Sequence, residues 1–151
     1  MKILIATDGS EFSRAAVKEC CRVIPDLASA KIKIVSAYEE PYVLAAEPFA
    51  VAAEYYQQMA DAAEQQARSF TASAAATIRE AISDSDLDIT VEIIRGPPGK
   101  EIVELADEWG ADLIVVGSHG YGFWGRMLGS VSDAVVHLAS CSVLVIRKPK
   151  D

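Results

Sequence analysis

Five of the nine glycines of this chain lie in one segment, from Gly117 to Ser130. Glycines at this density let a backbone approach a phosphate closely. The segment leads into a helical pattern, whose first N–H groups and dipole favour an anion. Ser130 is placed to cap that helix and to turn its hydroxyl toward a phosphate oxygen. Glycines also favour a flexible connecting loop, so the spacing by itself leaves both interpretations open.

Three further side chains could contribute to such a site. Asp8 follows the first apolar run, where it could contact a ligand or close the turn by an Asx-type hydrogen bond. His119 could donate to a phosphate or act as a general base, and loop packing is its alternative role. Arg126 is the fixed cation of the loop, available to neutralise phosphate or to remain a solvated surface charge. His137 falls within a helical pattern and is expected to be structural.

Apolar runs and helical spacings alternate along the chain and define the elements that must position these residues. The later runs lack polar alternation, which is typical of strands buried on both faces of a parallel sheet. With right-handed crossovers the pattern predicts an open, doubly wound α/β sandwich, a five-stranded parallel sheet with helices on both faces. The predicted strands are Lys2–Thr7, Ile32–Tyr38, Ile89–Ile94, Leu113–Gly117 and Ser142–Ile146, and the predicted helices are Ser10–Ile24, Phe49–Ile82, Lys100–Trp109 and Ser130–Ala139.

Such a sheet binds ligands at the carboxyl ends of its strands, where the winding direction reverses. The order of the strands is not readable from the sequence. However, Asp8-Gly9-Ser10 and the segment from Gly117 to Ser130 both follow predicted strands and both precede predicted helices. These two strand ends are therefore the expected site.

Length, composition and charge exclude several classes of protein. The 151 residues predict one domain, residues 1–151, and the chain has 51% apolar and 24% charged residues. A net charge of −8 disfavours nucleic acid, although backbone N–H groups can still hold a small anion. The longest stretches without charge are 13 residues, short of the roughly 20 that a spanning helix needs. We expect a cytoplasmic protein with no membrane contact and with reduced thiols at Cys20, Cys21 and Cys141.

Several motifs resemble the universal stress protein family. The spacing Gly117-x-x-Gly120, followed after a gap by Gly129-Ser130-Val131, resembles the nucleotide loop of that family. Residues 3–10 resemble its first strand and turn, and residues 96–117 and 130–146 are similar to its second half. The resemblance covers essentially the whole chain, and its last third is the most specific part.

The resemblance implies a five-stranded α/β fold of the adenine nucleotide alpha hydrolase-like kind, usually dimeric, with one branch of the family binding ATP. This chain resembles the ATP-binding branch, and Mg²⁺ is expected with the nucleotide. One feature departs from the family pattern: eight residues, Tyr121–Leu128, stand where the family has nine.

Carried over position by position, the resemblance implies a set of nucleotide-binding residues. They are Ala6 and Asp8 under the nucleoside, Ala37 at the adenine edge, Val116 and Gly117 beside the base and sugar, and Gly120, Gly129, Ser130 and Val131 at the phosphates, with Ser118 and His119 between the first two loop glycines.

Three functions remain in competition. The first is an ATP-binding regulatory module of a stress response. The second is a slow ATPase, although no general base, nucleophile and metal carboxylate converge in the sequence, and so we expect no enzyme. The third is a nucleotide-free dimeric interaction protein, which the shortened loop favours.

Two surfaces are expected to meet partners. A homodimer would pair the C-terminal strand Ser142–Ile146 with a second copy, and Thr90–Ile94 is the competing edge. The aromatic residues Tyr121, Phe123 and Trp124 could shield a nucleotide or dock a protein partner.

Overall fold

The computed structural model describes residues 1–39, 53–82, 87–119 and 127–148. Five parallel strands form one sheet in the order β3-β2-β1-β4-β5. They are β1 (Lys2–Ala6), β2 (Lys31–Tyr38), β3 (Asp88–Arg95), β4 (Leu113–Gly117) and β5 (Ser142–Ile146). The predicted fold class is confirmed, and each strand bound lies within one residue of its prediction.

Four α-helices connect the described strands, with a short 3₁₀ turn, η1 (Leu27–Ser29), before β2. The helices are α1 (Glu11–Val23), α2 (Ala53–Ala81), α3 (Pro98–Trp109) and α4 (Ser130–Leu138). The predicted start of the second helix at Phe49 lies outside the described residues. Helix α3 begins two residues earlier than predicted, because Pro98 fits a first helical position, where the fixed φ suits the helix and no N–H is needed.

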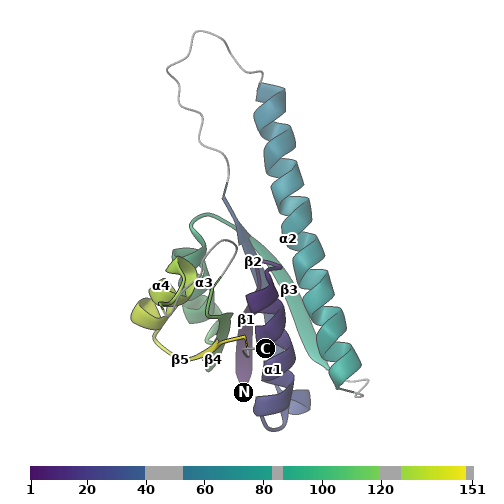
Figure 1. Ribbon diagram of the computed structural model, residues 1–151, viewed down its shortest axis with the longest axis vertical. Helices are drawn as coiled ribbons and strands as arrows, with labels where there is room; N and C mark the ends of the chain where they lie inside the picture. Colours follow the sequence, from purple (N-terminus) through teal and green to yellow (C-terminus); the bar gives the residue numbers. More distant parts are fainter. Residues whose placement is uncertain (40–52, 83–86, 120–126, 149–151) are drawn as a thin grey trace.

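The helices cover the two faces of the sheet, as Figure 1 shows. On one face α1 and α2 bury Val17, Cys20 and Ile78 against Ile3 and Ile5 of β1. On the other face, α3 and α4 bury Ile102, Leu105 and Val135 against the alternate residues of the strands, such as Leu4 and Val116. Strands β1 and β4 are therefore apolar on both sides, which is why their sequences lack alternation.

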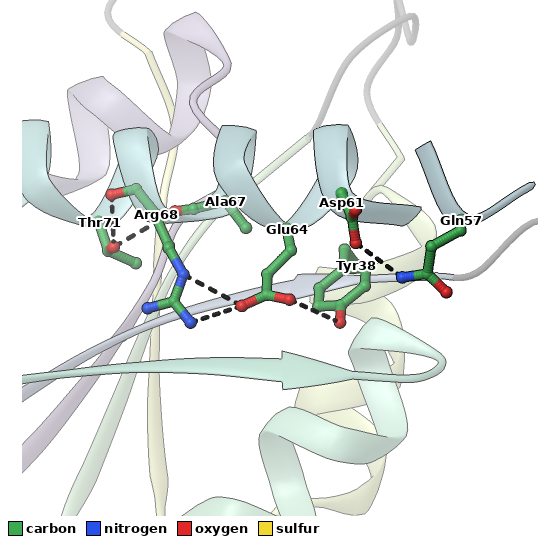
Figure 2. Close-up of polar contacts among 7 residues, drawn as sticks. All are labelled: Tyr38, Gln57, Asp61, Glu64, Ala67, Arg68 and Thr71. Carbon is green, nitrogen blue, oxygen red and sulfur yellow. Dashed lines mark hydrogen bonds and ion pairs between the residues drawn. The ribbon is translucent and has the colours of Figure 1, made fainter. Parts of the chain in front are cut away.

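Helix α2 extends well past the sheet (Figure 1). Its 29 residues span about 44 Å at 1.5 Å per residue. Close to the end of β2, Tyr38 Oη lies 3.5 Å from Glu64 Oε2, and Arg68 Nε donates to Glu64 Oε1 at 3.1 Å (Figure 2). Farther along, the Thr71 hydroxyl donates to the backbone of α2 and the side chain is buried.

The described residues also bear on the predictions about membrane spans and about the cysteines. Across those residues, no helix combines the length and the apolar character that crossing a membrane requires. Cys20, Cys21 and Cys141 are free thiols, as predicted.

Candidate functional site

The strand order places a switch in winding direction between β1 and β4. From β1 the chain passes to β2 and β3 on one side, and β4 and β5 lie on the other side. The helix after β1 packs on one face of the sheet and the helix after β4 packs on the opposite face. The carboxyl ends of β1 and β4 are consequently left uncovered between them, which is where open α/β sheets hold ligands.

A cavity of about 310 Å³ opens at this point. Its volume lies near the lower end of the range for small-molecule sites, about 300–1,000 Å³. Of the predicted site residues, it is lined by Ala6, Asp8, Ala37, Val116, Gly117, His119, Gly129, Ser130 and Val131. The structure thus gathers in one cavity residues that are far apart in the sequence.

The lining also contains residues that the sequence did not single out, namely Thr7, Ser13, Val35, Pro98, Ile102 and Ser132. Aliphatic side chains such as Val35, Ile102 and Val116 make an apolar wall, and Thr7, Ser13 and Ser132 add hydroxyl groups. This mixture suits a ligand with one apolar part and one polar part.

The other residues singled out in the sequence do not line the cavity or lie outside the described residues. Ser118 does not line the cavity, and its side chain pairs with His119 instead. Gly120, Tyr121, Phe123, Trp124 and Arg126 lie outside the described residues. His137 is exposed on α4, and its Nδ1 lies 2.9 Å from the Asp133 carbonyl oxygen.

Asp8 makes the Asx-type hydrogen bond and also lines the cavity. The Ser10 N–H donates to Asp8 Oδ1 at 3.0 Å, which closes the turn before α1. That bond fixes the orientation of the carboxylate beside the cavity. The two roles weighed for Asp8 are therefore compatible in this geometry.

Three buried hydroxyl groups, those of Thr7, Ser10 and Ser13, form a cluster at the beginning of α1. Ser10 caps the helix by accepting the Ser13 N–H at 3.2 Å, and Thr7 Oγ1 donates to Ser13 Oγ at 3.1 Å. Thr7 Oγ1 also accepts the Gly9 N–H at 3.3 Å. Because every hydroxyl has a partner, the cluster holds Thr7 and Ser13 in place on the cavity wall.

Gly117 allows α1 to lie directly against the end of β4. A Cβ atom at this position would stand 2.8 Å from the Phe12 carbonyl carbon and 2.9 Å from the Ser13 nitrogen. Contacts that short with backbone atoms leave no room for a larger residue. Glycine is therefore required here by packing rather than by an unusual φ.

Backbone hydrogen bonds join the two ends of the glycine-rich segment. The Gly129 N–H donates to the Ser118 carbonyl at 2.8 Å, and the Ser118 N–H donates to Ile146 of β5 at 2.8 Å. The Ser132 hydroxyl donates to the same Ser118 carbonyl at 3.0 Å. Ser118 thus positions the beginning of α4 against the sheet from outside the cavity.

The prediction that Ser130 caps α4 is wrong, because Gly129 occupies the N-cap position and Ser130 is the first helical residue. The first helical hydrogen bond runs from the Asp133 N–H to the Gly129 carbonyl. The N–H groups of residues 130–132 therefore have no acceptor within the helix. Since these residues line the cavity, this end of it favours an anion.

His119 is held in the cavity wall with 8% of its surface exposed. Its Nδ1 lies 3.0 Å from Ser118 Oγ, and its ring centroid lies 5.2 Å from that of Phe12 on α1. His119 thus packs against Phe12 and also lines the cavity. Among the described lining residues, His119 and Asp8 are the ones with ionisable side chains. The described ranges contain no group of three metal-ligating side chains.

The fold and the site define an α/β protein with a ligand cavity at the switch point of a parallel sheet. The model of the universal stress protein family matches residues 1–147. Universal stress protein MJ0531 of Methanocaldococcus jannaschii is 31% identical over 151 residues, which cover 99% of this chain and 83% of the relative. The chain belongs to the universal stress protein family.

Further relatives and solved structures agree with this assignment. Universal stress protein A homolog 2 of Coxiella burnetii is 41% identical over 71 residues, 46% of this chain and 49% of the relative. UspA of Lactobacillus plantarum has the same fold, with a TM-score of 0.76 and 24% identity over 97% of each chain. A universal stress protein solved in complex with cAMP is 27% identical, with a TM-score of 0.64 over 97% of this chain and 96% of that structure.

Proposed function

We propose that this chain is an ATP-binding regulatory module of a stress response. The observation that carries the proposal is the 310 Å³ cavity at the switch point, where the predicted residues of β1, β2, β4 and α4 meet. In this proposal the apolar wall would take the adenine ring, Asp8 would lie beside the ribose, and the beginning of α4 would bind the phosphates. The cAMP complex of a relative 27% identical to this chain supports an adenine nucleotide as ligand.

The nucleotide acts as a regulator in this proposal and not as a substrate. The described lining contains one carboxylate, Asp8, and one imidazole, His119, without a nucleophile activated by either. Mg²⁺ would be brought by the triphosphate, which supplies most of its own oxygen ligands. We place the protein in the cytoplasm on the basis of its composition.

A titration calorimetry experiment with ATP, AMP and adenosine tests the proposal. The backbone of Gly129, with φ −70° and ψ 160°, is one that any residue adopts, so Gly129→Val adds bulk at the cavity without backbone strain. We expect micromolar ATP binding by the wild type and its loss in Gly129→Val. Val136→Ala, a change at an exposed position of α4, is the matched control and should bind as the wild type does. Equal ATP affinity in all three proteins would contradict the assigned site.

The nucleotide-free interaction protein remains the second candidate, since eight residues replace nine in the loop. Absence of binding by all three ligands in the wild type would favour it. AMP binding as tight as ATP binding would mean that the loop does not hold the outer phosphates.

We also propose a homodimer formed through β5. Strand β5 is one edge of the sheet and β3 is the other, so each leaves backbone groups for a partner strand. Sedimentation should give twice the 16.2 kDa of one chain. Val145→Lys on β5 should shift the mass to the monomer, and Val91→Lys on β3 should leave it unchanged. The opposite pattern would move the interface to β3.

A further inference from the structure

We propose that His119 couples ligand binding to pH, so that an anionic ligand binds more tightly when the imidazole is protonated. The inference rests on the proposed function, because it requires the cavity to hold an anionic nucleotide. Among the described lining residues, the one side chain able to become positive near neutral pH is His119.

The geometry keeps the imidazole in the cavity wall. The Ser118 hydroxyl fixes one ring nitrogen at 3.0 Å, and the Phe12 ring packs against the imidazole at 5.2 Å. With 8% of its surface exposed, a protonated ring gains little solvation from water. An anion bound in the cavity would supply the counter-charge that a protonated ring in this position needs.

The charged groups on the elements that surround the cavity would not give the same pH-dependent attraction for an anion. Asp8, which follows β1, lines the same cavity, and its carboxyl group cannot become positive. On α1, Glu11 is next to Phe12 and is ion-paired at 2.9 Å with Lys148, which follows β5. On α4, Asp133 is exposed and lies near His137. The N–H groups at the start of α4 attract an anion equally at every pH.

The sign of the effect follows from linkage. An anion stabilises the imidazolium, so the pKa of His119 is higher in the complex than in the free protein, and binding takes up a proton. Affinity for an anion therefore rises as pH falls through the titration range of histidine. An opposite charge within about 4–6 Å raises such a pKa by at least about one unit, which corresponds to about tenfold in affinity.

The experiment uses cAMP and adenosine, titrated into the full chain at several values between about pH 5 and 8. The phosphodiester of cAMP keeps one negative charge across this range, so the ligand itself contributes no titration. Adenosine has the same base and ribose without the charge. We expect cAMP to bind about tenfold more tightly at the acid end, and adenosine affinity to change less than about twofold.

The two histidines of the chain provide a matched pair of variants. His119→Gln should abolish the pH dependence of cAMP binding, whereas His137→Gln, at an exposed position of α4, should retain it. The imidazole resonances of the wild type give a second readout that needs no variant: the pKa of His119 should rise by about one unit when cAMP binds, and that of His137 should not.

Three results would overturn the inference. One is a pH-independent affinity for cAMP in the wild type, and another is a pH dependence that persists in folded His119→Gln. The third is an unchanged His119 pKa in the cAMP complex. In each of these cases nucleotide binding itself still stands. If neither ligand binds at any pH, the proposed function fails and the inference fails with it.

Discussion

Replacing Gly117 by alanine tests how the sheet and α1 create the cavity. The new Cβ atom would stand 2.8 Å from the Phe12 carbonyl carbon and 2.9 Å from the Ser13 nitrogen. A comfortable contact between carbon atoms is about 3.5–4.0 Å, so the beginning of α1 has to retreat by roughly 0.7 Å or more. Both atoms belong to backbone, which leaves no flexible side chain to yield.

Two quantities should change in this variant. Overpacking of a rigid core typically costs about 1–3 kcal/mol, and we expect the free energy of unfolding to fall by that amount. The retreat of α1 also displaces Ser13, which lines the cavity and bonds to Thr7 at 3.1 Å. Loss of one well-placed polar contact costs about 1 kcal/mol or slightly more, so ATP affinity should fall about tenfold.

Urea unfolding and calorimetric titration of the same preparation measure both quantities. Gly110→Ala is the control: its φ of +68° strains any larger residue by about 1–2 kcal/mol, while the nearest atom to the new Cβ, Lys2 Nζ, is 3.7 Å away. Gly110 ends α3 near the amino ends of β1 and β4, whereas the cavity lies at their carboxyl ends. The control should lose stability and keep its ATP affinity. The reasoning is refuted if Gly117→Ala binds ATP as the control does, or if it unfolds like the wild type.

Two further predictions concern buried hydroxyl and thiol groups. Thr7→Val removes the donor to Ser13 and should lower the free energy of unfolding by about 1–3 kcal/mol; a variant as stable as the wild type in urea would show that the cluster contributes nothing. The hydrogen bond between neighbouring thiols raises the pKa of Cys20 and lowers that of Cys21, while burial raises the pKa of Cys141. Because the thiolate is the reactive form, iodoacetamide should label Cys21 first in the folded protein near neutral pH, as read by peptide mass spectrometry, and earlier labelling of Cys141 would contradict this.

Strands β1 and β4 could be predicted closely because their two buried faces leave continuous apolar runs, as in Leu113–Gly117. Their order in the sheet could not, because it depends on long-range pairing that no local pattern records. The position of the cavity depends on this order, because it requires β1 and β4 to be neighbours in the sheet.

The cavity residues that the sequence missed have a common physical reason. Val35 and Ile102 are buried apolar residues, and the sequence pattern of a cavity wall is the same as that of a core. Ser132 lies one helical turn from the cap, where its hydroxyl bonds to backbone. Gly129 takes the N-cap position predicted for Ser130. Its N–H donates to the Ser118 carbonyl, and its carbonyl accepts the Asp133 N–H. These two backbone hydrogen bonds decide where α4 begins, in spite of the preference for serine at the N-cap position.

The most direct test of the central claim is to follow the backbone amide resonances of the isotopically labelled chain during titration with ATP. Nucleotide binding at the switch point predicts shifts concentrated at residues 6–8 and 37, around Gly117 and His119, and at residues 129–132. The amide resonances of β3 and of the far end of α2 should not shift. Shifts centred on β3 or α2, or an unchanged spectrum at saturating ATP, would contradict the account.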